Sequence, residues 1–269
     1  MQLTARTFVC WCCSRDYDLI PVHYAAIRKL TNEAVMYIYD GNEKDKEGNP
    51  VAAPKVPNGA ATVPSNFERH GNLNGKAVVK GMVEFYNELG NMGVERIVKV
   101  DSDTVLTTLD WVDNRYNVGF HGSNGYYWTG CAYSLTMNTL RLIKDYLDKI
   151  DIEPAKGYTL PEDQVLTQIA ALVQAEPVVL IENGKYVCTG FMPAMRSKPE
   201  VVKGIHGVCH CGQYQRLDPL VGCGIGRTPL VKSDMRYVLK HVYSKERQRP
   251  IKSDVPEHSF ISAKKKAGD

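Results

Sequence analysis

The sequence predicts an α/β fold, with a mostly parallel, mixed central sheet flanked by helices in a single large domain. Short runs of β-branched residues alternate with stretches of helical periodicity through the first hundred residues, an order typical of βαβαβ units. The chain has 269 residues, of which 43% are hydrophobic and 23% charged. This size and composition suit one globular body with a substantial core. Such a sheet, with right-handed crossovers, binds ligands at the carboxyl ends of its strands.

The elements of the first half follow from two kinds of pattern. Runs of β-branched and aromatic residues predict strands, and apolar side chains three or four residues apart predict helices. In chain order, these patterns predict a strand at 7–13, a helix ending at Leu30, a strand at 34–39, a helix at 76–89 and a strand at 95–100. Four prolines and several small residues between 42 and 66 break both periods, so we expect a long loop there.

The second half predicts a less regular order. An aromatic, glycine-rich segment covers 118–133. After it, the same patterns predict helices at about 134–150 and 160–174, and strands at 178–181 and 186–189. We therefore expect a main body at 1–231, with a regular half at 1–104 and a mixed half at 105–231, followed by a basic C-terminal helix and tail at 232–269.

The tail differs from the body in charge. Residues 232–269 hold ten Lys and Arg against five Asp and Glu, so the net charge of +3 divides into +5 for the tail and −2 for the rest. A basic segment of this kind binds nucleic-acid backbones or anionic membrane surfaces. The alternative is a solvated, frayed terminus.

Two features of the chain bear on its location. No apolar run approaches the roughly 20 residues that cross a bilayer, and the first residues carry no pattern typical of a secretory signal. The eight cysteines are irregularly spaced. We therefore expect no membrane insertion, and reduced thiols in the cytoplasm, which is the host cytoplasm for a viral protein.

Two acids follow the third predicted strand directly. Asp101 and Asp103 lie two residues apart after the mostly apolar run 97–100. In an extended chain such residues project to the same side, so both carboxylates are expected to reach one ligand. Their hard oxygens suit Mg²⁺ or Mn²⁺, with substrate phosphates completing the coordination. The alternative is that Asp-Ser-Asp serves only as a turn after the strand.

This order of motifs resembles the glycosyltransferases of the GT-A fold, whose DxD motif holds the metal and the diphosphate of a nucleotide sugar. The resemblance covers most of residues 7–210 and lies in motif order rather than close identity. It implies that 1–231 is the catalytic domain, with a nucleotide-sugar-binding donor half at 1–104 and an acceptor half at 105–231. It implies nucleotide contacts from polar residues after the strands and at the start of the helix before the acid pair, namely Ser14, Arg15, Asp40, Lys76 and Asp101. The alternatives are that Asp40 begins a turn, that Arg15 is solvated and that Lys76 lies on an exposed helix face.

The resemblance extends to the second half. The segment 126–133 is similar to the family segment in which small residues let a sugar approach the backbone and aromatic rings form an acceptor platform, here Gly130 and Trp128. Trp128 would serve a core equally well. Glu162 and Asp163 resemble the family's acidic element at the acceptor side. Because the four residues ending at Glu162 also form a capping box, Asp163 is assigned as general base if the reaction inverts, or as a sugar-orienting group if it retains.

A histidine- and cysteine-rich segment follows residue 205. Many family members supply a late histidine to the metal, and the resemblance assigns that role to His206, with His210 as the alternative. A structural zinc site is a second interpretation, with further ligands at Cys209, Cys211 and Cys223. Buried thiols with one hydrogen-bonded histidine are a third.

Together these motifs predict an enzyme that uses Mn²⁺ or Mg²⁺ to transfer a sugar from a nucleotide sugar, preferably a UDP-sugar, to an acceptor hydroxyl. The acceptor stays open between a 5-hydroxymethylpyrimidine in DNA, as in small phage-type DNA glycosyltransferases, and a glycan, lipid-linked or protein acceptor. The rival classes are a nucleotidyltransferase, which usually carries a glycine-rich loop after its first strand, and a non-catalytic zinc or nucleic-acid-binding protein.

Overall fold

The computed structural model describes residues 2–65, 75–112, 118–121, 128–147, 165–166, 169, 177–178, 181–182, 185–190, 193–212 and 227–243. In chain order, the elements are β1 (Arg6–Trp11), the 3-10 helix η1 (Ser14–Leu19), α1 (Ile20–Arg28), β2 (Ala34–Asp40), β3 (Ala60–Ser65), α2 (Gly75–Asn91), β4 (Arg96–Asp101), β5 (Thr104–Leu106), β6 (Val118–His121), β7 (Trp128–Thr136), α3 (Met137–Leu147), β8 (Pro177–Val178), β9 (Ile181–Glu182), β10 (Lys185–Gly190), the 3-10 helix η2 (Pro193–Ser197), α5 (Pro199–Lys203), β11 (Ile205–His210) and α7 (Arg227–Val242). The predicted order of strand, helix, strand, helix, strand is present in the first hundred residues, with one unpredicted strand, β3, between β2 and α2.

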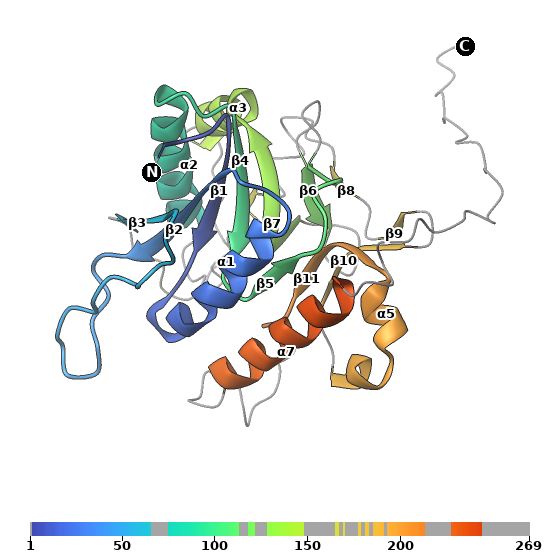
Figure 1. The fold of residues 1–269 in the computed structure, drawn as a ribbon. Coiled ribbons are helices and arrows are strands. Elements are labelled where there is room, and N and C mark those ends of the chain that lie inside the picture. Colours follow the sequence, from blue (N-terminus) through green and yellow to red (C-terminus); the bar gives the residue numbers. More distant parts are fainter. Residues whose placement is uncertain are drawn as a thin grey trace, which may run out of the picture.

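The central sheet has the strand order β3-β2-β1-β4-β7-β6-β8 (Figure 1). The strands β1 to β4 are parallel, and Phe8 of β1 lies between its partners Val35 of β2 and Val98 of β4. The strand β7 runs antiparallel to β4, and β6 runs antiparallel to β7. The predicted α/β fold, with a mostly parallel, mixed central sheet flanked by helices, is confirmed.

Helices cover both faces of this sheet (Figure 1). Successive residues of a strand point to opposite faces, so each strand contributes to two core clusters. Val9 and Ile97 pack with α2 and α3 in one cluster, whereas Phe8 and Val98 pack with α1 in the other. Each large apolar side chain that is fully buried in this way stabilises the fold by roughly 1.5–3 kcal/mol.

A second, smaller sheet begins just after β4 and has the strand order β5-β11-β10-β9. The strand β11 pairs antiparallel with β5 and parallel with β10. Between Ile205 and Val208, β11 has one residue more than β10 has in the matching stretch, which makes a β-bulge. The Thr107 hydroxyl fills this bulge, because it donates to the Ile205 carbonyl at 2.9 Å and accepts from the Gly207 amide at 2.8 Å.

The helix α7 packs onto the rest of the described structure. Its side chains Val231, Met235 and Val238 are buried with Leu19 and Cys209 in a third core cluster. In Figure 1 it lies beside α1, with which it makes contact. The domain boundary predicted at residue 231 falls inside this helix. Neither α7 nor any other helix in the described ranges is long and apolar enough to cross a membrane.

The predicted strand at 178–181 is divided between β8 and β9, which belong to different sheets, and β6 and β11 were not predicted as strands. Two further segments differ from the predicted elements. The end of the predicted loop forms β3, an edge strand, and an edge position tolerates Pro64 because its missing amide is not needed by a further strand. The strand β7 continues through Ser134, where a helix was predicted to begin, and α3 starts only at Met137. In both cases pairing with a strand distant in the sequence overrides the local periodicity.

Candidate functional site

The carboxyl ends of β1 and β4 meet where the strand order reverses. From β1 the chain moves outward through β2 to β3, and it then returns to place β4 on the other side of β1. Trp11, at the end of β1, is the pairing partner of Asp101, at the end of β4. Chain segments that leave two such strands in opposite directions open a crevice, and α/β sheets bind their ligands there. The predicted acid pair therefore lies at the expected position for a ligand.

The acid turn, residues 101–103, is bent and not extended. Asp101 ends β4, Ser102 and Asp103 form a turn, and β5 begins directly afterwards. The Ser102 amide donates to the Trp11 carbonyl at 3.3 Å, which ties the turn to the end of β1. The extended geometry expected for the two acids is therefore not the one that the chain adopts. Asp101 and Asp103 have different surroundings as a result.

Asp103 lies against the second sheet and is only 1% exposed. Its carbonyl accepts from the Cys211 amide at 2.9 Å. His210 pairs with Thr104 across β11 and β5, and its Nε2 lies 3.3 Å from Oδ1 of Asp103. His206 is four residues earlier on β11, which is roughly 13 Å along an extended strand. Of the two predicted histidines, His210 is the one that the fold brings to the acid turn.

Asp101 lies against the central sheet, and its Oδ1 is 2.9 Å from Nζ of Lys99. The Lys99 side chain is 1% exposed, whereas that of Asp101 is 20% exposed. The Lys99 ammonium also donates to the Gly130 carbonyl in β7 and lies 5.3 Å from the centroid of the Tyr133 ring. A buried cation thus links the acid turn to the strand that carries the predicted acceptor residue Gly130.

A buried histidine of α1 lies near the acid turn. His23 is fully buried, and its Nδ1 is 3.0 Å from the Tyr37 hydroxyl in β2. Burial lowers the pKa of His23 to about 4, and the charges of Asp103 and Asp101 oppose this shift without cancelling it. The imidazole is therefore neutral at pH 7, and it does not compensate the negative charges of Asp103 and Asp101.

The turn after β1 is held by the turn after β2. The Ser14 amide donates to Oε2 of Glu43 at 3.2 Å, and the Ser14 hydroxyl donates to the other oxygen of the same carboxylate. Oδ1 of Asp40 accepts a hydrogen bond from the Asn42 amide at 2.9 Å. Asp40 therefore begins a turn, which was the alternative to its predicted nucleotide contact. The Arg15 side chain is 49% exposed. Ser14 and Arg15, at the start of η1, and Asp40, at the end of β2, thus lie at the carboxyl edge of the sheet.

Several predicted site residues cannot be placed at this edge. Glu162 and Asp163 fall in the range 148–164, and Cys223 in the range 213–226, both outside the described residues. Lys76 belongs to α2 and Trp128 begins β7, but their side chains are not among those described. The roles assigned to these residues stay predictions.

In the ranges that the structure covers, no group of three or more His, Cys, Asp and Glu side chains could hold a metal on its own. Cys209 and Cys211 are buried free thiols, and burial raises the pKa of Cys211, which works against the thiolate that zinc requires. Asp103 and His210 offer one carboxylate and one imidazole. Because Mg²⁺ is commonly held by one or two carboxylates plus substrate phosphates, this pair fits a divalent cation that arrives with a diphosphate.

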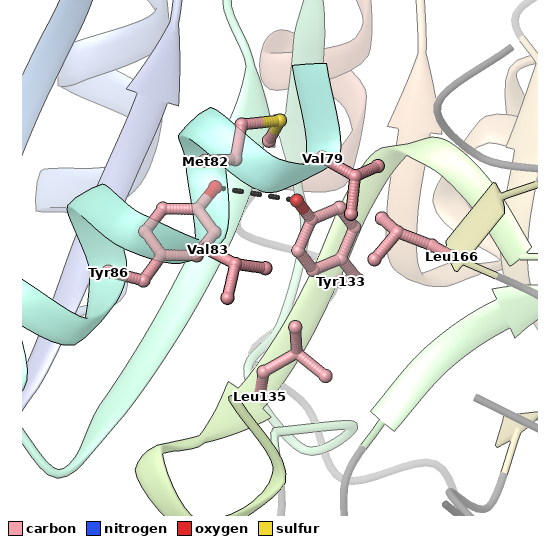
Figure 2. Close-up of a pocket in the computed structure, with 7 residues that line it drawn as sticks. All are labelled: Val79, Met82, Val83, Tyr86, Tyr133, Leu135 and Leu166. Atoms are coloured by element: carbon pink, nitrogen blue, oxygen red, sulfur yellow. Dashed lines mark hydrogen bonds between the residues drawn. The ribbon is translucent and has the colours of Figure 1, made fainter. Parts of the chain in front are cut away.

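A small apolar pocket lies between α2 and β7 (Figure 2). It has no room for a water molecule, and it is lined by Val79, Met82, Val83, Tyr86, Tyr133, Leu135 and Leu166. Figure 2 shows the hydroxyls of Tyr86 and Tyr133 pointing toward each other, at 3.4 Å. The Trp11 indole donates to the Tyr86 hydroxyl at 2.8 Å. The pocket is part of the packed core, and its tyrosines support Trp11 and Lys99 from behind.

Three side chains that interact with the acid turn or with Ser14 were not predicted from the sequence: Lys99, Glu43 and His23. Lys99 had a visible signal, because it is the one charged residue in the run Ile-Val-Lys-Val before the acid pair. Glu43 had a weaker one, as an acid three residues after Asp40. His23 had none, since a histidine on the apolar side of a helix is ordinarily a core residue.

The sequence matches no family model, and no curated protein matches it either. What the protein does is therefore inferred from the acid turn and its neighbours.

Proposed function

We propose that the protein is a metal-dependent glycosyltransferase that moves a sugar from a nucleotide donor, preferably a UDP-sugar, to an acceptor hydroxyl. One observation carries the proposal: Asp103, in the turn before β5, and His210, in β11, meet near the carboxyl ends of β1 and β4, where the strand order reverses. Burying the charge of a carboxylate is costly unless an opposite charge compensates it. A bound cation beside Asp103 would supply that compensation. The GT-A resemblance favours the same place for the cation and the diphosphate.

In this function Asp103 and His210 would hold Mn²⁺ or Mg²⁺. The cation, when bound, supplies charge stabilisation for the departing nucleoside diphosphate. The chain itself supplies position, because the pairing of β5 with β11 and the Cys211 amide hold Asp103 and His210 in place. Ligands held by a rigid ladder lose little conformational freedom when the substrate arrives.

The nucleotide would lie over the turns after β1 and β2. Glu43 fixes Ser14 there, and Arg15 is a half-exposed cation that can face phosphate oxygens. The carboxylate of Asp40 already accepts one hydrogen bond within its turn and has a second oxygen to offer a base or ribose. The long helix α2 begins at this same edge of the sheet and brings Lys76 with it, so its positive N-terminal end favours an anionic ligand.

The acceptor would approach over β7. Gly130 has no side chain to block that approach, and its carbonyl is held by Lys99. Trp128, Glu162 and Asp163 keep their predicted roles as platform, helix cap and general base. The acceptor class is proposed as a 5-hydroxymethylpyrimidine in DNA or, alternatively, a glycan or protein hydroxyl.

The test is release of UDP or GDP from a panel of nucleotide sugars, with Mn²⁺ or with EDTA, for the wild type and Asp103→Asn. We expect release that requires metal and is lost in the variant, while Asp110→Asn, an exposed acid after β5, behaves like the wild type. Metal-independent release that survives Asp103→Asn would falsify the proposal. Release of pyrophosphate from nucleoside triphosphates instead would identify a nucleotidyltransferase.

The acceptor class needs a separate measurement. Hydroxymethylated DNA is incubated with the same donors, and its nucleosides are analysed by mass. A gain of one hexose or pentose on hydroxymethylpyrimidine supports the DNA acceptor. Donor turnover without any such gain rejects DNA and leaves a glycan or protein acceptor.

A further inference from the structure

Lys99 is a buried cation in a strand position that core packing would fill with an apolar residue. It lies in β4 between Ile97 and Asp101 on the face that packs against α2 and α3, and its side chain is 1% exposed. Its chain neighbours Val98 and Val100 are fully buried on the opposite face. A lysine is almost never this buried unless it is paired.

The contacts of Lys99 span two elements of the site. Its ammonium lies 2.9 Å from Oδ1 of Asp101 on its own strand and donates to the Gly130 carbonyl on β7. The ring of Tyr133 lies below it, with the centroid 5.3 Å from Nζ. Behind that ring, the hydroxyl of Tyr86 meets that of Tyr133 (Figure 2). Lys99 is therefore held in one position and links Asp101 to the predicted acceptor strand.

Stability alone is a poor reason for such a pair. Replacing a buried ion pair with apolar residues of similar volume is often neutral or stabilising, because desolvation offsets the attraction between the charges. Arg96, the other buried cation of β4, lies at the amino end of the strand, where it donates to the neutral Ser134 hydroxyl at 2.9 Å. Lys99, at the carboxyl end of the strand, differs from Arg96 because its partner is Asp101, an acid of the acid turn.

We propose that Lys99 is a positioning residue that compensates the charge of Asp101 and holds it beside Gly130, which leaves Asp103 and His210 to bind the cation. This inference rests on the proposed function. It implies that the acid turn presents about one net negative charge to a ligand, and not two. A single charge attracts a divalent cation while repelling the diphosphate less than two charges would.

The proposal predicts opposite shifts of two affinities. In Lys99→Met the charge of Asp101 is uncompensated, so we expect Mn²⁺ alone to bind about fivefold to tenfold tighter and UDP without metal to bind weaker by a similar factor. A purely structural loss would weaken both. Lys99→Arg keeps the charge and should keep both affinities near wild type.

The deciding variant is Lys99→Met/Asp101→Asn, which removes both charges together. If Asp101 serves only as the charge that Lys99 compensates, both affinities return to within about twofold of wild type, since the net charge is restored. If Asp101 is itself a cation ligand, the Mn²⁺ affinity of the double variant falls well below that of the wild type, and the proposal is overturned. Lys144→Met, at an exposed position of α3, is the matched control.

The measurements are Mn²⁺ binding followed by electron paramagnetic resonance, and UDP binding followed by calorimetry, both at pH 8 on the full chain. Circular dichroism and urea unfolding establish that each variant is folded. If Lys99→Met is not folded, Lys99→Met/Asp101→Asn, which leaves no uncompensated charge, decides the question alone. If the wild type binds neither Mn²⁺ nor UDP, the proposed function fails. If the wild type binds both and Lys99→Met binds both as the wild type does, only the role of Lys99 fails.

Discussion

Asp101 and Asp103 are two residues apart, yet they belong to different regions of the molecule. Asp101 ends a strand of the central sheet and pairs with a buried lysine. Asp103 precedes a strand of the second sheet and lies against a histidine. The first carboxylate is already compensated by a fixed cation, whereas the second faces a side chain that is itself a metal ligand in many proteins. A motif of two acids can therefore divide its work between charge balance and ligand binding.

Because their surroundings differ, replacing Asp101 and replacing Asp103 should have different effects. Removing the Asp103 carboxylate takes away a proposed ligand and should act mainly on turnover. Removing the Asp101 carboxylate leaves Lys99 buried without its compensating charge and should act mainly on stability. The experiments below test whether the two regions separate in this way.

The largest expected effect is on turnover in Asp103→Asn. We expect metal-dependent release of nucleoside diphosphate to fall about a thousandfold, because an amide binds a divalent cation much more weakly than a carboxylate does. Initial rates at saturating donor and Mn²⁺ measure this effect. An Asp103→Asn variant that keeps more than a tenth of the wild-type rate would remove Asp103 from the site and erase the difference between the two acids.

The next effect is on the stability of Asp101→Asn. We expect the free energy of unfolding to fall by about 3 kcal/mol, since breaking a buried pair leaves an uncompensated charge inside the fold. Urea unfolding at pH 7 measures it, and Asp110→Asn on the exposed surface should change it by less than about 0.5 kcal/mol. A loss as small as that of the control would mean that the charge of Lys99 is compensated by something other than Asp101.

A smaller effect concerns pH and His23, on the α1 side of the acid turn. The folded-state pKa of His23 is about 4, below the ordinary value of 6.5, so only the unfolded chain binds this proton between those values. Stability is therefore retained above pH 6.5 and lost as the pH falls toward 4, by roughly 2 kcal/mol between pH 7 and pH 5.

His23→Gln removes this titration while keeping a partner for the Tyr37 hydroxyl. Its unfolding free energy should depend on pH less than that of the wild type by the same roughly 2 kcal/mol. Identical pH profiles for the two proteins would show that the interior beside Asp103 is wetter than the structure implies.

The smallest effect belongs to the tyrosines behind Lys99. Tyr86→Phe leaves the Trp11 indole without the acceptor it has at 2.8 Å, which should lower stability by about 1–2 kcal/mol. Thermal unfolding measures this loss, and Tyr146→Phe on the surface of α3 is the control, with no change expected beyond about 0.5 kcal/mol. If Tyr86→Phe matches the control, the Asp101 region is less tightly supported than its contacts indicate.

The sequence predicts the first half of the fold well because its signals there are local. The runs that form β1, β2 and β4 are β-branched, and α2 carries a clear apolar stripe, so period alone identifies them. The strand β3 was missed because its residues, which include Pro64, show no strand pattern and are ordered by pairing with β2. The strand β7 was partly missed for the same reason, since β4 and β6 hold it on both sides.

The site divides in the same way. The acid pair and its place after the third predicted strand could be read directly, because a run of apolar residues leads into it. The choice between His206 and His210 could not, since it depends on the pairing of β11 with β5 across about a hundred intervening residues. The partnership of Lys99 with Gly130 depends on the pairing of β4 with β7 in the same way.

The bulge filled by the Thr107 hydroxyl decides which side chain stands next to Asp103. Side chains alternate along a strand, so a shift of one residue exchanges each for its neighbour. Deleting Gly207 would make the two strands equal in length here; if β11 then keeps its pairing at Ile205, Cys211 takes the place of His210 beside Asp103, whereas His210 stays there if the pairing with β5 holds. A soft thiolate ligand there would favour zinc over Mn²⁺ or Mg²⁺. If the proposed function is right, the extra residue of β11 therefore helps to select the metal, although it lies three residues before the proposed ligand His210.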